Sequence, residues 1–207
     1  MCIRDRDAII RRYLPESKGS YLDVGCGNPI KGSNTYVFYK RGWNGTTIDP
    51  LSHLLVRHRI IRPRDTQLKG VVGNVDADGL FFEFEADDFS TSSVDRYEEL
   101  VDKGMQLRRK RVVKVIHLQD LDIYAQPLEP FLLDIDIEGL EKDVLLSMNW
   151  ERFTPRVIAI EEWDSPIYTK SEIRILLEAK NYQLVSRAFV TSIYVNNQYL
   201  SRVSTSD

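Results

Sequence analysis

A glycine-rich turn, Asp23-Val-Gly-Cys-Gly27, lies between a short apolar segment and an amphipathic one. Its glycines, Gly25 and Gly27, permit a tight turn and the close approach of a ligand, and Cys26 between them is small. Asp49 follows about 22 residues after Gly27, at the end of the next apolar segment. A carboxylate at this spacing suits hydrogen bonds from ribose hydroxyls. Together these residues predict a binding site for a cofactor that contains a nucleoside.

The residues around the turn indicate the type of cofactor. A dinucleotide-binding turn has a third glycine at the position of Ile30, so the pyrophosphate-binding pattern is incomplete. The Asp23 carboxylate would repel a pyrophosphate and attract a cationic amino group, such as that of S-adenosylmethionine. The alternative is a purely structural turn in which Asp23 caps backbone amides. We expect Ser33 and Asn34 to flank the methionine end, and Asn74 to approach the adenine.

Farther along the chain, carboxylates alternate with apolar residues at Asp134, Asp136 and Glu138. On one continuous strand they would share a face and repel each other unless a cation, hydrogen-bond donors or protonation compensated them. We expect Asp134 beside the cofactor, and Asp136, together with Glu138 or Glu161, as the catalytic group that positions or deprotonates the acceptor hydroxyl. The candidate ligands of a divalent cation are Asp136 and Glu138 with Glu161 or Glu162. The structural alternative is that Glu138 caps the next helix and Asp134 pairs with an arginine.

Several other side chains have both a functional and a structural interpretation. His117 is a second candidate for the base or a ligand, and a structural histidine is the alternative. His53 follows the ribose carboxylate closely enough to contact the adenosine. The segment Arg62-Pro-Arg-Asp65 either binds an anionic group or braces a loop. Trp163 either packs in the core or stacks on a sugar.

The carboxylate series also allows a different chemistry, metal-dependent phosphodiester hydrolysis by Asp134, Asp136 and Glu138. A nuclease would need a basic groove, and the dense basic run is confined to residues 108–111 with Lys114. That run is either a solvated segment or an attraction site for an anionic acceptor. The chain has 28 Lys and Arg against 31 Asp and Glu, a net charge of −3. This balance is unlike that of a dedicated nucleic-acid binder, so we expect no nucleic-acid partner.

Composition places the chain among ordinary globular proteins. Hydrophobic residues make up 43% and charged residues 29%, and no apolar run approaches the 18 or more residues of a membrane span. The first residues lack the apolar core of a signal peptide, so we expect a cytoplasmic protein. Cys2 and Cys26 are expected as free thiols. Residues 1–6 look arbitrary beside the rest of the chain, and no inference rests on them.

Apolar segments that alternate with amphipathic ones predict a mostly parallel sheet with helices on both faces. The expected strands are residues 21–25, 45–49, 68–73, 80–85, 112–118, 131–137 and 157–161, and two more within 184–196. The expected helices are residues 8–14, 33–41, 51–58, 96–103, 140–153 and 171–180. We expect 68–73 and 80–85 to form a hairpin, and the last two strands to form an antiparallel hairpin at one sheet edge.

A family resemblance covers roughly residues 20 to 195. The matching segments include Asp23-Val-Gly-Cys-Gly-Asn-Pro29, Ser33-Asn-Thr-Tyr36, Ile48-Asp-Pro50, Arg62-Pro-Arg-Asp65 and Leu133-Asp-Ile-Asp-Ile-Glu-Gly-Leu140. In this order they resemble the FkbM family of S-adenosylmethionine-dependent methyltransferases. Related members often carry histidines where this chain has Gly27 and Asn28. A role for those histidines is therefore not expected here.

The resemblance implies the class I methyltransferase fold, an α/β Rossmann-like sheet of seven strands with an antiparallel last strand. It also implies methylation of hydroxyl groups, often on sugars. We expect an N-terminal helix and leader over residues 1–18, and one methyltransferase domain over 19–207 with a variable insertion near 86–110. The expected partner is a small-molecule or glycan acceptor, and the sequence does not indicate the oligomeric state. The alternatives are the phosphodiesterase and a module that binds the cofactor without catalysis.

Overall fold

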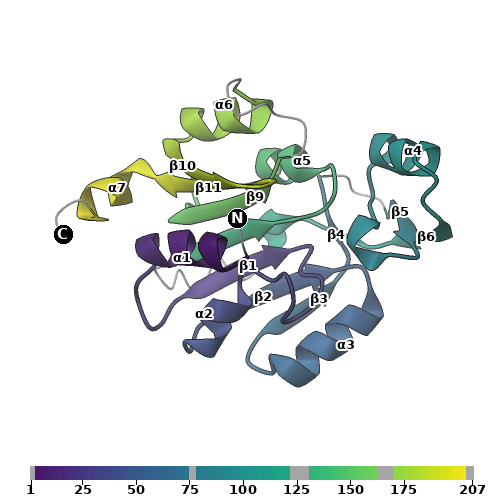
Figure 1. Cartoon of the computed structure of the whole chain (residues 1–207), viewed down its shortest axis with the longest axis horizontal. Helices are drawn as coiled ribbons and strands as arrows, with labels where there is room; N and C mark the ends of the chain where they lie inside the picture. Colours follow the sequence, from purple (N-terminus) through teal and green to yellow (C-terminus); the bar gives the residue numbers. More distant parts are fainter. Residues whose placement is uncertain (1–2, 75–77, 122–130, 163–169, 204–207) are drawn as a thin grey trace.

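The computed structural model describes residues 3–74, 78–121, 131–162 and 170–203, with a seven-stranded sheet at the centre. The strands are β1 (Ser20–Val24), β2 (Asn44–Asp49), β3 (Thr66–Lys69), β8 (Phe131–Ile135), β9 (Val157–Glu161), β10 (Tyr182–Ala188) and β11 (Thr191–Asn196). They lie in the order β10-β11-β9-β8-β1-β2-β3 (Figure 1). Strand β11 is antiparallel to both its neighbours, whereas the other pairs are parallel. The expected mostly parallel sheet with an antiparallel edge hairpin is confirmed.

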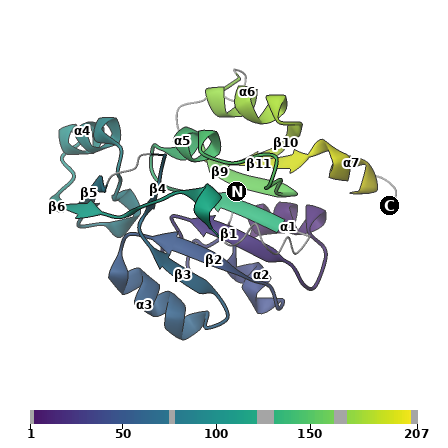
Figure 2. The ribbon, with the colours of Figure 1, turned by 180° about the vertical axis from the view of Figure 1, so that it is seen from behind.

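Helices cover both faces of this sheet (Figures 1 and 2). They are α1 (Ile3–Tyr13), α2 (Tyr36–Lys40), α3 (Ser52–Ile61), α5 (Glu141–Leu146), α6 (Glu172–Ala179) and α7 (Asn197–Val203). Because successive strand side chains point to opposite faces, Tyr21 and Leu132 enter the core under α1 and α2. Their neighbours Leu22 and Leu133 enter the core under α5 and α6. Within the described ranges, no helix combines the length and the apolar character that crossing a membrane requires.

A smaller unit lies to one side of the sheet in both views (Figures 1 and 2). Strands β5 (Gly79–Phe84) and β6 (Leu107–Val113) pair antiparallel, and α4 (Val94–Asp102) packs on them. Phe82, Phe84 and Leu100 form its core, and the ring centroids of Phe82 and Tyr97 are stacked 4.1 Å apart. We call residues 79–113 the hairpin unit. It contains the stretch near 86–110 that the sequence marks as variable.

The expected hairpin between residues 68–73 and 80–85 is wrong. The first of these segments splits at Gly70, so that β3 stays in the large sheet and β4 (Val71–Val72) pairs with β7 (Val115–Ile116). Gly70 allows this because a Cβ there would lie 2.6 Å from the backbone oxygen of Lys114. The second segment pairs instead with β6, beyond an intervening helix. The prediction that neighbouring segments pair therefore gave the wrong strand partner.

Two expected helices are shorter than their patterns suggest. The segment 140–153 is helical only to Leu146, because Asn149 Oδ1 accepts hydrogen bonds from the amides of Glu151 and Arg152 and begins a separate turn. The segment 33–41 is helical only from Tyr36. Ser33 and Asn34, which precede this helix, line a pocket at the end of the sheet and are held there by other contacts.

Candidate functional site

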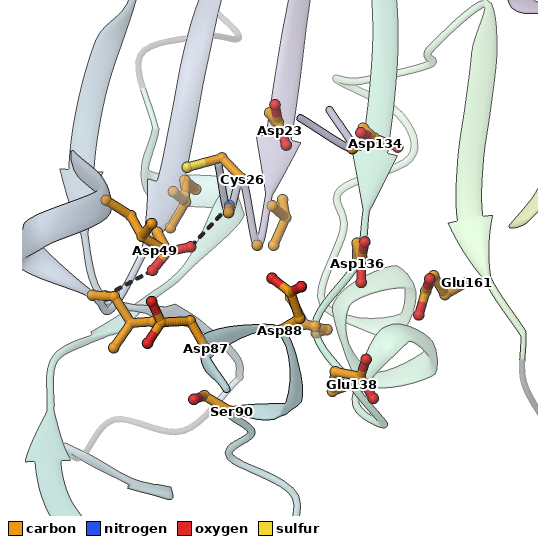
Figure 3. Close-up of a pocket in the computed structure, with 18 of the residues that line it drawn as sticks. Asp23, Cys26, Asp49, Asp87, Asp88, Ser90, Asp134, Asp136, Glu138 and Glu161 are labelled. Atoms are coloured by element: carbon orange, nitrogen blue, oxygen red, sulfur yellow. Dashed lines mark hydrogen bonds between the residues drawn. The ribbon is translucent and has the colours of Figure 1, made fainter. Parts of the chain in front are cut away.

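A pocket of about 440 Å³ opens at the carboxyl ends of the parallel strands, where ligands bind in sheets of this kind (Figure 3). The turn after β1 and the end of β2 form one side of it. The segments that follow β8 and β9 form the other side, and the hairpin unit adds Asp87, Asp88 and Ser90. Residues from distant parts of the sequence thus surround one small-molecule-sized space.

The neighbouring backbone, as well as the pocket, determines the conformation of the glycine turn. Gly25 has a φ of +79°, and a Cβ on it would lie 1.7 Å from the backbone oxygen of Asp136. Gly27 has a φ of +51°, and a Cβ there would meet only the oxygen of Gly25, 3.9 Å away. The amides of Gly25 and Cys26 both donate to the carbonyl of Ile48. Burial raises the pKa of the free Cys26 thiol, so it lines the pocket as a small neutral group.

Asp49 ends β2 and holds the glycine turn in place. Its Oδ2 accepts a hydrogen bond of 3.1 Å from the amide of Gly27, and its Oδ1 accepts one of 2.7 Å from the amide of Leu51. Desolvation raises the pKa of Asp49 to about 6, although these two amides oppose the shift. The oxygens of a carboxylate have further lone pairs, so Asp49 can also accept hydrogen bonds from a ligand in the pocket.

A buried arginine braces the loop that follows the turn. Arg62 is fully buried and donates to the carbonyl of Pro29 and to the hydroxyls of Ser33 and Thr35. Thr35 in turn donates to the carboxylate of Asp23, whose Oδ2 lies 3.7 Å from the guanidinium. The bracing role expected as one alternative for the Arg62 segment is therefore confirmed. Ser33 and Asp23 line the pocket while their side chains take part in this network.

Asn34 connects this loop to the neighbouring strand. Its Nδ2 donates a hydrogen bond of 2.8 Å to Oδ1 of Asp134, which stands opposite Asp23 in the register of β8 and β1. Desolvation, followed by the charge of Asp23, raises the pKa of Asp134 to about 8. The Oδ1 of Asn34 is buried without a hydrogen-bond partner, and the residue lines the pocket. An unpaired acceptor beside two carboxylates suits a cationic amino group.

The end of the pocket beyond Asp49 is apolar. Leu51 and Phe81 pack together there with Val71, so the segment after β2, strand β4 and the hairpin unit share this wall. Asn74, which the sequence places near the adenine, is exposed and does not line the pocket. No sequence signal singled out Phe81, because its segment was assigned to the wrong strand pair.

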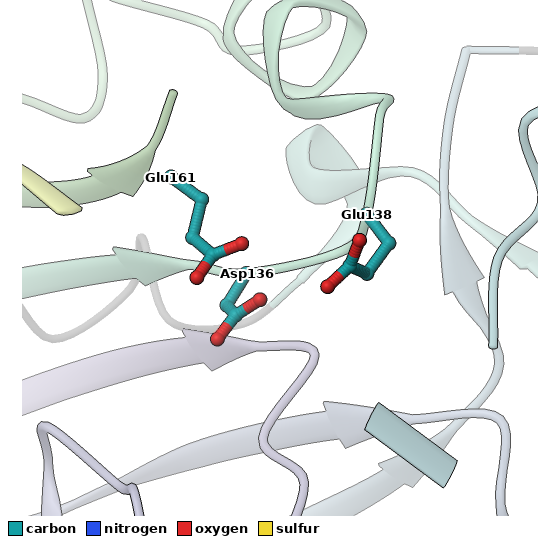
Figure 4. Close-up of side chains that lie close together, drawn as sticks. All are labelled: Asp136, Glu138 and Glu161. Carbon is teal, nitrogen blue, oxygen red and sulfur yellow. The ribbon is translucent and has the colours of Figure 1, made fainter. Parts of the chain in front are cut away.

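Three carboxylates converge on the opposite side, as Figure 4 shows. One oxygen each from Asp136, Glu138 and Glu161 lies within 4.8 Å of the others. Strand β8 ends at Ile135, so these groups come from a loop and from the end of β9 and not from one strand face. Desolvation and then the charge of Glu161 raise the pKa of Asp136 well above its ordinary value, although its side chain faces the open pocket. Burial likewise raises the pKa of Glu138 to about 7.

Glu138 also fastens the hairpin unit to this side of the pocket. The guanidinium of Arg96 on α4 donates to Glu138 Oε2 at 2.8 and 3.1 Å, and the hydroxyl of Thr91 donates to the Glu138 carbonyl. Glu138 has a φ of +57°, which is rare for a residue with a side chain and is found mainly where function or packing enforces it. The expected cap of the next helix by Glu138 is wrong, because α5 has no side-chain cap; the amide of Gly139 donates instead to the carboxylate of Glu141 in the first turn.

The remaining candidates lie away from the pocket lining or serve other contacts. His117 is half-buried and does not line the pocket. His53 Nε2 lies 2.7 Å from Asp87 Oδ2, which links α3 to the hairpin unit. In the basic run, Arg108 and Arg109 pair with the buried Glu83, which favours the structural interpretation. Trp163 lies outside the described residues.

Comparison with known proteins decides the family. The methyltransferase FkbM domain matches residues 23–184, from the aspartate that opens the glycine turn to β10. The chain belongs to the FkbM methyltransferase family. Among curated protein sequences, none matches this chain.

Solved structures that resemble this FkbM methyltransferase include monomeric WbdD, with a TM-score of 0.48 and 13% identity over 95% of this chain and 42% of WbdD. A TehB-like S-adenosylmethionine-dependent methyltransferase from Corynebacterium glutamicum gives 0.46, with 10% identity over 92% of this chain and 86% of that one. The 1,6-didemethyltoxoflavin-N1-methyltransferase from Burkholderia thailandensis gives 0.45, with 13% identity over 93% and 76%. Since each score is below 0.5, the family assignment does not depend on these structures.

The family match confirms the expected enzyme class, a methyltransferase that uses S-adenosylmethionine. It decides against the phosphodiesterase and the non-catalytic module, which were the alternatives from sequence. The pairing of Arg108 and Arg109 with Glu83 also counts against the phosphodiesterase, because these arginines do not form a free basic groove.

Proposed function

We propose that this FkbM methyltransferase transfers a methyl group from S-adenosylmethionine to a hydroxyl group of a sugar or glycan-type acceptor. The observation that carries the proposal is the division of one pocket into two parts. Asp49 and an apolar wall lie at one end, and the convergent carboxylates Asp136, Glu138 and Glu161 lie at the other. One end suits a nucleoside and the other suits a hydroxyl.

Several features of the chain fit the cofactor. Asp49 has free lone pairs for the ribose hydroxyls, and Leu51 and Phe81 provide an apolar wall for the adenine. The unpartnered Oδ1 of Asn34, next to Asp134, is suited to the amino group of the methionine moiety. The φ of Gly27 and the open space on its Cα leave room for a ligand beside the turn. Asp23 contributes negative charge from its place in the Arg62 network.

The carboxylate cluster is proposed to act on the acceptor. Asp136, whose pKa is raised well above its ordinary value, is the group that we propose accepts a hydrogen bond or proton from the acceptor hydroxyl. Glu138 and Glu161 position the same hydroxyl or its neighbour. When bound, S-adenosylmethionine supplies an electrophilic methyl group. The chain contributes mainly alignment, because it fixes the hydroxyl oxygen in line with that methyl. His117 and Asn74 have no part in this proposal.

The charge of the cluster favours a neutral acceptor. Asp87 and Asp88 of the hairpin unit add to the carboxylates that line the pocket. These charges would repel a phosphorylated or uronic sugar, so the idea that the basic run recruits an anionic acceptor loses its support. Carboxylates are strong hydrogen-bond acceptors, and a neutral sugar offers several hydroxyl donors.

A divalent cation is compatible with the same three carboxylates, since hard cations prefer oxygen ligands. In that case Asp136, Glu138 and Glu161 would hold it and would orient the acceptor through it. We also propose a cytoplasmic protein, and the division into an N-terminal helix and leader over residues 1–18 and one domain over 19–207 with a variable insertion near 86–110.

The proposal is tested by binding and by turnover. Purified protein is heated with S-adenosylhomocysteine, NAD or Mg²⁺, and a ligand at a hundredfold excess over its Kd stabilises the folded state by about 2.7 kcal/mol. We expect S-adenosylhomocysteine to raise Tm and NAD to leave it unchanged. The protein is then incubated with S-adenosylmethionine and a set of neutral methyl glycosides, with Mg²⁺ or with EDTA, and products are detected by mass spectrometry.

A methylated glycoside that Asp136→Asn fails to form, while S-adenosylhomocysteine still binds, would support the proposal. Loss of product in EDTA would assign the cluster to a cation. Stabilisation by NAD alone, or binding of S-adenosylhomocysteine without product from any glycoside, would contradict it.

A further inference from the structure

The turn between β10 and β11 brings an aromatic residue to the pocket. Phe189 and Val190 form this two-residue turn, and both line the pocket. Thr191 pairs with Glu161, and the carbonyl of Val190 accepts a hydrogen bond of 2.8 Å from the amide of Glu162. The turn is therefore fixed beside the end of β9, on the carboxylate side of the pocket.

The side chain of Phe189 is exposed and does not pack in the hydrophobic core. It is 83% exposed, more than any other large apolar side chain in the described part of the chain. A single exposed apolar residue is common on protein surfaces and needs no functional explanation by itself. Here, however, the residue lines the pocket and belongs to none of the hydrophobic clusters.

The backbone of Phe189 is also strained. Its φ is +61°, and in the two-residue turn only this first position has a positive φ. Glycine is the usual residue at such a position, because any side chain there crowds the following carbonyl group. A bulky aromatic residue in this region is rare, and strained residues of this kind cluster at ligand-binding and active sites. Exposure and strain thus point independently to a use for the ring.

The position of the ring relative to the cofactor end defines that use. Asp49 ends β2, whereas β9 and β11 lie on the opposite side of β1 and β8 in the strand order. A ligand that is anchored at Asp49 therefore leaves the side of Glu161 and Phe189 to the acceptor. An acceptor held there would lie beside the carboxylates and near the turn that carries Phe189.

We propose that Phe189 is an acceptor-binding residue, and that its ring packs on the C–H face of a pyranose. This inference rests on the proposed function and deepens it. A pyranose combines hydroxyl donors for Asp136 and Glu161 with an apolar face for the ring. A phenolic acceptor has a flat face too, but it ionises more readily, and its anion would be repelled by the carboxylates.

The experiment uses saturation-transfer NMR on the full chain with S-adenosylhomocysteine present. The probes are methyl α-D-glucopyranoside, methyl α-D-mannopyranoside and methyl α-L-rhamnopyranoside, with catechol as the phenolic comparison. The proteins are the wild type, Phe189→Gly, Phe189→Tyr and Ile175→Ala. Ile175 on α6 is 56% exposed and does not line the pocket, so it controls for the loss of any exposed apolar side chain.

We expect saturation transfer to the ring C–H protons of at least one glycoside. The signal should fall at least fivefold in Phe189→Gly and persist in Phe189→Tyr and Ile175→Ala. The Kd for S-adenosylhomocysteine and the Tm should not worsen in Phe189→Gly, because glycine relieves the strained φ. A lower Tm would show instead that the ring stabilises the hairpin, and would overturn the inference.

Three other outcomes would also overturn it: signals that are equal in the wild type and Phe189→Gly, signals that are absent from both, or signals that are confined to catechol. If the wild type does not bind S-adenosylhomocysteine, the proposed function itself fails. If S-adenosylhomocysteine binds but the glycoside signals do not change in Phe189→Gly, the proposed function stands and the role of the ring is rejected.

Discussion

Gly25 and Asp136 are so close that a methyl group on Gly25 would lie 1.7 Å from the Asp136 backbone oxygen. The amide of Asp136 also donates a hydrogen bond of 2.9 Å to the carbonyl of Val24. The end of β1 and the segment after β8 therefore share one fixed geometry. Since the first leads to the proposed cofactor residues and the second to the proposed acceptor residues, this contact sets the relation between the two parts of the pocket.

Gly25→Ala should unfold or strongly destabilise the protein. The added methyl must displace the Asp136 backbone, and the positive φ of +79° adds a cost of roughly 1–2 kcal/mol for any side chain. Gly104→Ala is the matched control, because Gly104 has the same φ of +79° and a Cβ there would meet nothing within 4 Å. We expect thermal unfolding to show a much lower Tm for Gly25→Ala than for Gly104→Ala. Equal Tm values would mean that the contact with Asp136 is not fixed.

Asp49→Asn should weaken cofactor binding. The carboxylate already accepts from two amides, and the proposal adds the ribose hydroxyls. Loss of a hydrogen bond to a charged group costs about 1.5–3 kcal/mol, or roughly 10- to 150-fold in affinity. Isothermal titration with S-adenosylhomocysteine measures this directly, and circular dichroism checks that the variant stays folded. An unchanged Kd in a folded variant would remove Asp49 from the cofactor site.

Asp134 should make stability depend on pH. Its pKa is about 8 in the folded chain against an ordinary 3.8, so the folded state binds this proton more tightly than the unfolded state. The stability that depends on the proton is present below pH 3.8 and is lost as the pH rises through about 8. Asp134→Asn removes this titration and keeps an oxygen that can accept from Asn34.

At the alkaline end of that range, Asp134→Asn should therefore exceed the wild type in Tm by at least about 2–4 °C, which corresponds to about 1 kcal/mol in a chain of this size. The difference should shrink toward the acidic end. The charge of Asp134 also raises the pKa of Asp136, so the comparison measures the titration of these two coupled groups together. A constant difference across the whole range would contradict the raised pKa.

Arg96→Ala should weaken acceptor binding and leave cofactor binding unchanged. Arg96 holds the hairpin unit to Glu138, so its loss should raise the KM for a glycoside several-fold at an unchanged Kd for S-adenosylhomocysteine. Arg96 also lowers the pKa of Glu138, which is about 7 with the arginine in place. If ionised Glu138 is required, the acidic limb of the pH–rate profile should move to higher pH in the variant.

The control for Arg96→Ala is Glu99→Gln, which removes an exposed partner of Arg96 and leaves the contact with Glu138 in place. It should behave like the wild type in KM and in pH profile. An acidic limb that stays in place in Arg96→Ala would show that Glu138 does not control the rate.

The sequence was informative where the signal is local. The turn around Gly25 and Gly27, the end of β2 at Asp49 and the strand that carries Asp134 each follow from a few adjacent residues, and their positions were predicted correctly. The helix expected from residue 33 was too long, because Ser33 and Asn34 are engaged by Arg62 and Asp134 and leave Tyr36 to begin the helix.

The features that sequence missed depend on contacts between distant residues. Arg96 and Glu138 are 42 residues apart, and nothing local links them. The turn at Phe189 has neither glycine nor asparagine, so it lacks the usual signal for a positive φ. Phe81 was assigned to a hairpin with its neighbour in sequence, although its strand pairs with β6 across α4. Pairing over such distances is decided by packing, which a single sequence does not display.

The most direct test of the central claim is a crystal structure with S-adenosylhomocysteine. We predict that the ribose hydroxyls bind Asp49, that the amino group lies at Asn34 Oδ1 beside Asp134, and that the sulfur faces Asp136. A pocket without the ligand in a crystal grown with it, or a nucleoside located among Asp136, Glu138 and Glu161, would contradict the account.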